Sequence, residues 1–313
     1  MITVVGEALV DLIEGPPGGP VAHPGGSPAN VAVALARLGE DAGLLTQVGD
    51  DPHGRLILRF LRANGVRLAP GTLLDATPTS AAHTTLRPDG QADYTFDIAW
   101  RAFEPTVSTV STGPAVSTVD GGVDCVHTGS IATFLEPGAA HVAALLRAAA
   151  ATATVSYDPN CRPSLMGDPE TAVRRVEDLV AMSDVVKVSQ EDLAWLYPGR
   201  RHDEIGRAWL ALGARLVVVT LGADGAWGST ARVAVTVSPV PVRVVDTVGA
   251  GDAFTAGLLH ACRTAGLLGA ANRDRLAGVD VPALTGMLAF ASQVAGITCA
   301  RRGADPPTLA DLP

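Results

Sequence analysis

From residue 123 onward, short apolar segments alternate with segments of helical periodicity, and this alternation is the strongest constraint on the fold. The apolar segments predicted as strands are 123–127, 154–157, 184–188 and 216–219, and the predicted helices are about 138–151, 170–182, 191–196 and 203–212. Repeated strand–helix units form a mainly parallel sheet with helices on both faces. The 313 residues show no repeat of fixed period and no low-complexity linker, so we expect one α/β domain.

Polar residues follow the ends of these predicted strands. They are Asp158 and Asn160, Ser189 and Asp192, Thr220 and Gly222, and the stretch 246–252. Ligands of open α/β sheets bind outside the carboxyl ends of the strands. We therefore predict one binding site along this edge of the sheet.

The stretch Asp246-Thr247-Val248-Gly249-Ala250-Gly251-Asp252 predicts an anion-binding turn. The β-branched residues before it predict a strand over 242–245 that stops at Asp246, and helical spacing follows the glycines. Glycine lets successive N–H groups face one point, and a helix N-terminus adds partial positive charge there. A carboxylate beside such a turn indicates phosphoryl transfer to an alcohol, with Asp252 as the base. The alternative is structural, because Asp is a common helix N-cap and glycine turns join many strands to helices.

A second glycine-rich segment, Gly25-Gly26-Ser27-Pro28-Ala29-Asn30, precedes a predicted helix that ends at Gly39. The glycines let the backbone approach a ligand, and the Asn30 amide both donates and accepts, which suits a ligand rich in hydroxyl groups. The alternative is that Ser27 caps the helix, Pro28 starts it and Asn30 is an exposed first-turn residue. The Gly- and Pro-rich residues 14–24 before this segment predict a loop.

Residues 72–100 interrupt the strand–helix pattern. Short alternating segments at 82–86 and 94–98 flank the turn Pro88-Asp89-Gly90, which predicts a hairpin. We expect a small sheet that projects from the main domain, with residues 8–13 as a further strand. Over a binding site this sheet would be a lid that excludes water, and the alternative is a hairpin with no role in the site.

Composition and charge exclude some classes of function. The net charge is −9 and there is no basic stripe, so we expect no nucleic-acid partner. The sequence contains no run of 18 apolar residues, so we predict no membrane span. The first residues predict a strand rather than a signal peptide. The four cysteines lack metal-ligand spacing, so a reducing, cytoplasmic setting is expected.

The two glycine-rich segments together resemble the signatures of the PfkB, or ribokinase-like, carbohydrate kinases. Residues 246–252 are similar to the C-terminal signature, and residues 25–39, with Val48-Gly49-Asp50-Asp51 and Gly54, are similar to the N-terminal one. The resemblance covers essentially residues 1–313. It implies one kinase domain with a β lid at about 72–100, and transfer of the γ-phosphate of ATP to a sugar hydroxyl group with Mg²⁺.

The resemblance also implies roles for particular residues of this chain. The catalytic group is Asp252 as the base, with Gly249, Ala250 and Gly251 as the anion hole. The residues that bind sugar hydroxyls are Asp11, Gly26 and Asn30. The residues that bind ATP are Ser189, Thr220, Gly222, Gly225 and, near the adenine, Ser292.

The metal ligands implied by the resemblance are less well defined. The family often carries an Asn-x-x-Glu motif that organises Mg²⁺ through water, and the corresponding positions here are Ser189 and Asp192, with Glu191 adjacent. We expect Asp192 or Glu191 to contact Mg²⁺ through water, with Asp158 as an alternative. A monovalent cation such as K⁺ is expected near Asp246, Val248 and residues 301–305.

Two cations lie near the predicted phosphate site in the sequence. Lys187, the only lysine of the chain, ends a predicted strand and could bind ATP phosphates, or it could be a surface residue without a role. Arg162 follows Asp158-Pro159-Asn160, and we assign it to the substrate.

Within the family the chain is most similar to bacterial fructokinases, on stretches such as 6–11, 127–130, 158–163 and 186–193. The reaction implied is the conversion of D-fructose to D-fructose 6-phosphate, and the alternative acceptors are ribose, 2-keto-3-deoxygluconate or a nucleoside. The residues expected to select the acceptor are Phe96, Asp97, Trp100 and Arg101. A non-catalytic regulator that binds sugar or nucleotide is an alternative from another class, and a homodimer through the lid is also expected.

Overall fold

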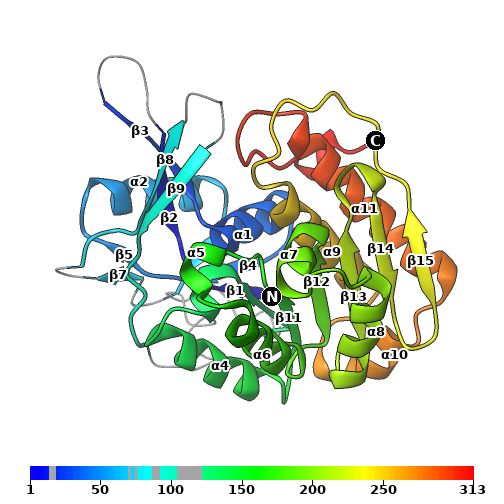
Figure 1. Cartoon of the computed structure of the whole chain (residues 1–313). Coiled ribbons are helices and arrows are strands. Elements are labelled where there is room, and N and C mark those ends of the chain that lie inside the picture. The colour runs from blue at the N-terminus through cyan, green and yellow to red at the C-terminus, as the bar shows by residue number, and fades with distance from the viewer. Residues whose placement is uncertain (14–18, 70–71, 75–76, 87–91, 104–121) are drawn as a thin grey trace.

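A nine-stranded sheet forms the centre of the computed structural model, which describes residues 1–13, 19–69, 72–74, 77–86, 92–103 and 122–313 (Figure 1). In spatial order its strands are β15 (Ala234–Val237), β14 (Ala226–Ser229), β13 (Leu216–Thr220), β12 (Val185–Ser189), β11 (Thr154–Asp158), β10 (Cys125–Gly129), β1 (Ile2–Val5), β4 (Ala42–Leu45) and β6 (Arg67–Leu68). All neighbours are parallel except β14, which is antiparallel to both β13 and β15. The predicted parallel α/β fold is confirmed.

Helices cover both faces of this sheet. On one face lie α1 (Ser27–Arg37), α2 (Pro52–Ala63), α9 (Ala250–Thr264), α10 (Arg273–Ala277) and α11 (Val281–Cys299). On the other lie α4 (Gly138–Ala149), α5 (Pro163–Met166), α6 (Pro169–Val180), α7 (Gln190–Leu196) and α8 (His202–Leu212). Strand β13 shows the division, because Val218 packs against the first set of helices and Val217 and Val219 against the second. The sheet is therefore buried on both faces, as its continuous apolar strands require.

The described residues also contain four short 3₁₀ turns and one small strand pair. The turns are η1 (Ser130–Thr133), η2 (Gly222–Asp224), η3 (Ala270–Asn272) and η4 (Leu309–Asp311). The pair is β5 (Val48–Gly49) with β7 (Leu73–Leu74), which are parallel. Of these elements, η1 and η2 follow β10 and β13 directly and so lie at the carboxyl edge of the main sheet.

A separate four-stranded sheet projects beside the main sheet (Figure 1). Its order is β3 (Val21–Gly25), β2 (Leu9–Ile13), β8 (Ala81–Leu86) and β9 (Ala92–Asp97). Strand β2 is parallel to β8 and antiparallel to β3, so residues 9–13 and the hairpin belong to one sheet. We refer to β3, β2, β8 and β9 as the small sheet. The predicted turn Pro88-Asp89-Gly90 lies outside the described residues.

The predicted loop over 14–24 is wrong for its last residues, because Val21–Gly25 form β3. Pro24 pairs with Val10 within this strand. Proline cannot donate a ladder hydrogen bond, so it is tolerated in a strand at the edge of a sheet, and β3 is such an edge strand. The composition of the segment therefore indicated a loop where the position in the sheet permits a strand.

The predicted strand over 242–245 is also wrong. This segment runs as an irregular connection from β15 to α9, and Val244 and Val245 are 60% and 56% exposed. The Val245 N–H instead donates to the Cys299 carbonyl at the end of α11, at 2.8 Å. The edge of the main sheet is already formed by β15, so β-branched residues alone did not identify a strand here.

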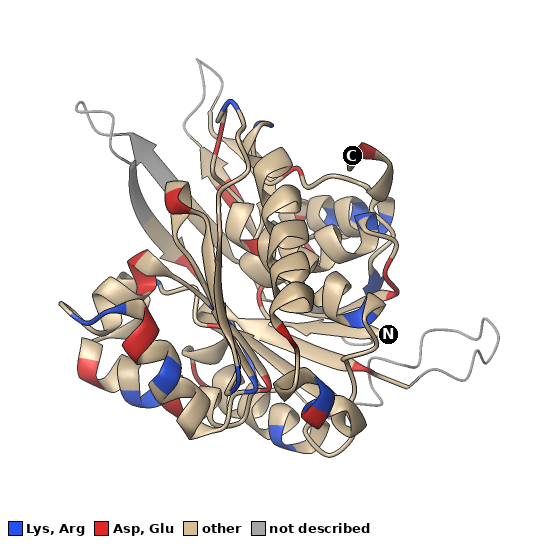
Figure 2. Ribbon diagram, turned by 90° about the vertical axis from the view of Figure 1, so that its right-hand side faces the viewer, with Lys and Arg blue, Asp and Glu red and all other residues tan. Residues whose placement is uncertain are grey.

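From the sequence we predicted no basic stripe and no membrane span. Acidic and basic residues are interspersed on the outer helices and form no basic stripe along the described chain (Figure 2). One described helix, α11, is long and apolar enough by length and composition to cross a membrane. Its residues Leu284, Leu288 and Ala291 are buried in the same core as α9, as in the core helix of a folded domain.

Candidate active site

Asp252 lies in the first turn of α9, and segments distant in the sequence converge on its carboxylate. Ser27 Oγ donates to Oδ1 at 2.7 Å, and Asn30 Nδ2 donates to Oδ2 at 2.9 Å. Asn160 follows β11, and its Nδ2 donates to Oδ1 of Asp252 at 3.4 Å. The side chain is only 7% exposed, so the two glycine-rich segments of the sequence meet at one buried acid.

The surroundings of Asp252 set its basicity. Burial raises its pKa above the usual aspartate value, and a like charge on Asp158 acts in the same direction. The hydrogen bonds from Ser27 and Asn30 and the charge of Lys187 oppose this rise but do not cancel it. A carboxylate with a raised pKa is a stronger proton acceptor than an exposed one, which suits a general base.

The turn before Asp252 has the geometry of an anion site. Gly249 is the N-cap of α9 with φ 74°, in the left-handed region, and a Cβ there would lie 2.6 Å from the Cβ of Ala304. Both facts require glycine at this position. The N–H groups of Gly249, Ala250 and Gly251 therefore begin α9 at the end where the helix dipole favours negative charge.

Lys187 forms a buried ion pair with Asp158 beneath this turn. Their side chains are 5% and 1% exposed, and Nζ lies 2.9 Å from Oδ2. A Cβ on Gly251 would lie 3.0 Å from the same Nζ, so the ammonium group is adjacent to the anion site. Burial lowers the pKa of Lys187, but the charge and hydrogen bond of Asp158, with the charges of Asp192 and Asp252, together raise it, so the net change is upward and the group stays charged. The alternative that Lys187 is a surface residue is wrong, and its role in binding phosphate stays a prediction.

Asp11 and Arg162 lie on the side of Asp252 that faces the small sheet. Asp11 is on β2, and burial raises its pKa while the Arg162 guanidinium lowers it. Arg162 Nη1 donates to Asn160 Oδ1 at 2.7 Å, next to the residue that reaches Asp252. Gly26 has φ 100°, and a Cβ there would lie 2.7 Å from the Glu7 carbonyl oxygen. The predicted sugar-binding residues therefore lie around the same acid.

The residues predicted to select the acceptor differ in their burial and in their contacts. Phe96 packs with Leu9 and Ile131, between the small sheet and η1. Trp100 is 5% exposed and belongs to the core. The main chain of Arg101 is held by the Gln47 amide, whereas its exposed side chain makes no hydrogen bond or ion pair with another described residue. The role of Arg101 stays a prediction.

The predicted nucleotide residues lie along the carboxyl edge of the main sheet. Ser189 and Thr220 are register partners at the ends of β12 and β13. Gly222 is the first residue of the 3₁₀ turn η2, two positions after Thr220, and Gly225 is the C-cap of this turn. Ser292 is buried in α11. The first four residues share one edge, and the position of Ser292 near the adenine stays a prediction.

The predicted magnesium residues occupy the start of α7. Asp192 Oδ1 accepts from the Cys161 N–H at 2.9 Å, and Asp192 forms a capping box with Ser189, whereas Glu191 is exposed. Within the described ranges, no three His, Cys, Asp or Glu side chains are grouped so as to hold a metal. This arrangement fits an ion held mainly by phosphate and water, because Mg²⁺ retains several water ligands.

The predicted monovalent-cation residues are brought together as well. Asp246 Oδ1 accepts from the Val248 N–H at 3.1 Å, and Oδ2 accepts from the Gly303 N–H at 2.8 Å. The carboxylate therefore holds two distant loops side by side. The binding of a monovalent cation here stays a prediction.

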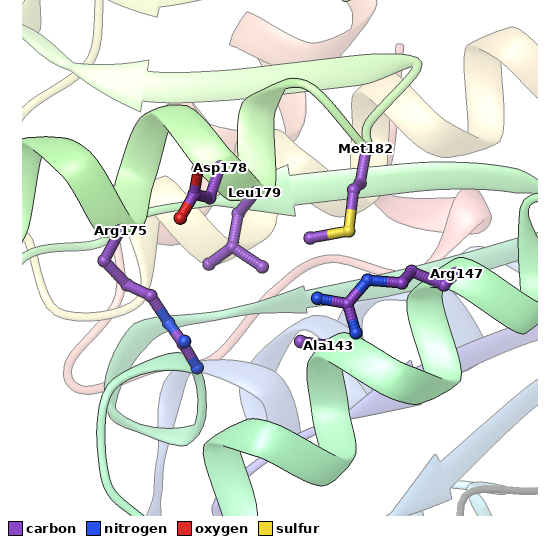
Figure 3. Close-up of a pocket in the computed structure, with 6 residues that line it drawn as sticks. All are labelled: Ala143, Arg147, Arg175, Asp178, Leu179 and Met182. Carbon is purple, nitrogen blue, oxygen red and sulfur yellow. The ribbon is translucent and has the colours of Figure 1, made fainter.

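A cavity of about 240 Å³ lies elsewhere, between α4 and α6 (Figure 3). Its lining consists of Ala143, Arg147, Arg175, Asp178, Leu179 and Met182. Several of these are in the last turns of helices that lead into β11 and β12, so the cavity lies toward the amino ends of the strands. None of the predicted site residues lines it.

Two contacts of Asp252 were not predicted from the sequence. In the structural alternative Ser27 caps the helix, but its hydroxyl donates to an acid 225 positions away, and Gly26 is the N-cap. Asn160 has φ 38°, an uncommon value for a residue other than glycine. The strand-end position of Asn160 was the one signal available in the sequence.

Substitution of Ser27 tests how the carboxylate is tuned. Ser27→Ala removes a hydrogen bond that lowers the pKa of Asp252, so the pKa rises further and the acidic limb of kcat/KM moves to higher pH. A charge-assisted hydrogen bond contributes about 1.5–3 kcal/mol, so we expect kcat/KM on the acidic limb to fall about ten-fold. Ser27→Thr keeps a hydroxyl group and is the control. An unchanged pH profile in the alanine variant would contradict this account of the tuning.

Phosphoryl transfer to an alcohol is the chemistry for which a buried acid of this kind, beside a glycine turn at a helix N-terminus and the polar carboxyl edge of a parallel sheet, is suited. A model of the pfkB family of carbohydrate kinases matches residues 1–311. The chain belongs to this family.

Relatives and solved structures extend the comparison. A fructokinase of Rhizobium leguminosarum bv. trifolii is 36% identical over 288 residues, 91% of this chain and 85% of the relative. The structure of Xylella fastidiosa fructokinase with bound ATP superposes with a TM-score of 0.86 at 27% identity, over 99% of this chain and 96% of that chain. A fructokinase double mutant of Vibrio cholerae O395, bound to fructose, ADP and potassium ion, gives 0.78 at 28% identity over 99% and 96%.

Proposed function

We propose that the chain is an ATP-dependent fructokinase that converts D-fructose to D-fructose 6-phosphate. The observation that carries the proposal is the position of Asp252, between hydroxyl-binding side chains and the N-terminus of α9. Fructokinases are among the relatives over nearly the whole chain, and the Vibrio cholerae structure contains fructose and ADP. Both substrates thus have a counterpart among the similar proteins.

In the proposed reaction the sugar hydroxymethyl group lies between Asp252 and the turn 249–251. Asp252 accepts the hydroxyl proton while the oxygen attacks the γ-phosphorus, and the bond from that phosphorus to the β–γ bridging oxygen breaks to release ADP. The N–H groups of the turn stabilise negative charge on the transferred phosphoryl group. Lys187 adds a fixed positive charge behind the turn.

The remaining assignments follow from this placement. Asp11, Asn30 and Arg162 would bind sugar hydroxyls, and Thr220 and Gly222 the nucleotide. Magnesium would neutralise phosphate charge, with its water ligands held by Glu191 or Asp192. A potassium ion would be held by the loops that Asp246 joins.

A lid role and a homodimer belong to the same proposal. The small sheet stands beside Asp252, so its closure would exclude water from the phosphoryl group. Ile13 and Val21 face each other across β2 and β3 and are 41% and 49% exposed, which favours a second copy packed on this sheet. The molecular mass in solution tests the dimer. We expect the reaction to take place in the cytoplasm, where ATP is supplied.

Release of ADP by the purified protein, with a panel of acceptors, tests the proposed function. We expect the highest kcat/KM with D-fructose and lower values with ribose, 2-keto-3-deoxygluconate and nucleosides. A higher value with one of these would replace fructose as the substrate. ADP release no greater than with ATP alone, for every acceptor, would instead favour a non-catalytic regulator.

A further inference from the structure

Two of the chain connections between the main sheet and the small sheet meet at Ala132 in η1. The outgoing connection, Gly6-Glu7-Ala8, joins β1 to β2, and the Ala132 N–H donates to Glu7 Oε2 at 3.1 Å. The returning connection follows β9, and Trp100 Nε1 donates to the Ala132 carbonyl oxygen at 3.1 Å. These two connections are therefore held by one residue, and we refer to residues 6–8 and 98–103 as the hinge.

Glu7 is an unusual residue for this position. It is 3% exposed, and burial raises its pKa to about 7, although its own backbone, Ser130, the Ala132 N–H and the Arg162 guanidinium all lower it. A buried ionised carboxylate is costly, and glutamine would offer the same acceptor to Ala132 without that cost. Perturbed buried acids of this kind occur preferentially at functional sites.

The hinge also touches the part of the site that holds the base. A Cβ on Gly26 would lie 2.7 Å from the Glu7 carbonyl oxygen, and one on Gly6 would lie 2.4 Å from Cγ of Pro28. Gly26 and Pro28 belong to the start of α1, which carries the Ser27 and Asn30 donors to Asp252. A shift of the hinge backbone would therefore move the first turn of α1.

Arg162 connects Glu7 to the proposed sugar side. It is the charged group that faces Glu7, and the same guanidinium lowers the pKa of Asp11 on β2. From η1, the groups that face the carboxylate are the buried Ser130 hydroxyl and the Ala132 N–H. The ionised form of Glu7 thus accepts from η1 and balances a cation assigned to the substrate.

We propose that Glu7 is a positioning residue: its ionised carboxylate fixes the hinge of the small sheet on η1 and thereby aligns the sugar-binding residues with Asp252. The inference rests on the proposed function for its kinetic consequences. Glu7 should affect the binding of the sugar rather than of ATP. Among the described interactions it contacts neither the anion-binding turn nor the nucleotide edge.

The test compares Glu7→Leu and Glu7→Gln with the wild type. We expect Glu7→Leu to raise the KM for fructose about ten-fold or more, with kcat and the KM for ATP changed less than about three-fold. Glu7→Gln retains an acceptor for Ala132 but not the charge, so its KM for fructose should lie between those of the wild type and Glu7→Leu, at the value that the wild type reaches when Glu7 is protonated. In the wild type kcat/KM for fructose should fall below about pH 7 as Glu7 is protonated, and this inflection should be absent in Glu7→Gln.

Glu40 supplies a matched control, because it is a poorly exposed carboxylate that pairs with His260 and Arg263 away from the site. Glu40→Gln should leave the fructose KM and the pH profile unchanged. A wild-type fructose KM in Glu7→Leu, or an inflection near pH 7 that persists in Glu7→Gln, would overturn the inference. A wild type inactive with every acceptor would instead overturn the proposed function.

Hydrogen exchange keeps the hinge assignment testable without turnover. Faster amide exchange at residues 98–103 and 130–133 in Glu7→Leu, with wild-type rates in α10 and α11, is the expected result. Exchange unchanged at both of these segments would refute the role of Glu7. Thermal stability gives a further check. Because the pKa of Glu7 is higher in the folded than in the unfolded protein, the stability present below the unfolded pKa is lost as the pH rises through about 7. Glu7→Gln should therefore melt at a higher temperature than the wild type at pH 8.5.

Discussion

Asp252→Asn is expected to lower kcat about 10²- to 10⁴-fold while leaving the affinity for ATP nearly unchanged. The amide cannot accept the hydroxyl proton, yet it preserves the shape of a side chain that is 7% exposed. The fold should not suffer, because burial raises the pKa of Asp252 and its ionised form therefore costs stability above that pKa. Steady-state kinetics, ATP binding by calorimetry and thermal melting at pH 8 measure these three effects.

The control for this substitution is Asp178→Asn on α6, which removes an exposed carboxylate beside the cavity of Figure 3. It should retain wild-type kcat. Turnover within about three-fold of wild type in Asp252→Asn would show that Asp252 is not the base. Loss of ATP binding together with turnover would assign the residue to binding instead.

Lys187→Met is expected to destabilise the protein by about 3–5 kcal/mol, because it leaves the Asp158 carboxylate buried without its cation. Asp158 is 1% exposed, and the groups that remain near its oxygens are the Asn160 N–H at 3.1 Å and the Thr255 hydroxyl at 3.4 Å. Equilibrium unfolding in urea measures the loss. The double variant with Asp158→Asn removes both charges and should be more stable than Lys187→Met alone.

The contrasting control is Arg55→Met, which breaks an ion pair with Asp50 whose two side chains are 52% and 55% exposed. Exposed pairs contribute about 0–1 kcal/mol, so this variant should unfold close to the wild type. If Lys187→Met lost no more stability than Arg55→Met, the pair would not be the buried support of the anion turn described above.

The sequence predicted the parallel core well because its signals are local. Each strand of β10 to β13 is a short apolar run followed by polar turn residues, and a strand buried on both faces needs nothing else. The segments 21–25 and 242–245 were misjudged for the opposite reason. Whether Val21–Gly25 or the valines near residue 244 form a strand depends on a free sheet edge, which belongs to the tertiary structure.

The same contrast between local signals and tertiary contacts applies to the site. Asp252 and the turn 249–251 were predicted because a glycine turn and an acid are adjacent in the sequence. The contacts of the Ser27 hydroxyl and the Glu7 carboxylate were not predicted, since their partners lie 225 and 125 positions away in the sequence. Lys187 was predicted to bind phosphate, but nothing local showed that it is buried against Asp158.

The most direct test of the account is identification of the product that purified protein forms from ATP and D-fructose. Phosphorus NMR of the reaction should show D-fructose 6-phosphate in amounts equal to the ADP released, with no sugar phosphate formed by Asp252→Asn over the same period. Phosphate on another hydroxyl group, or no sugar phosphate from the wild type, would contradict the assignment of a fructose hydroxymethyl group to the space between Asp252 and the N-terminus of α9.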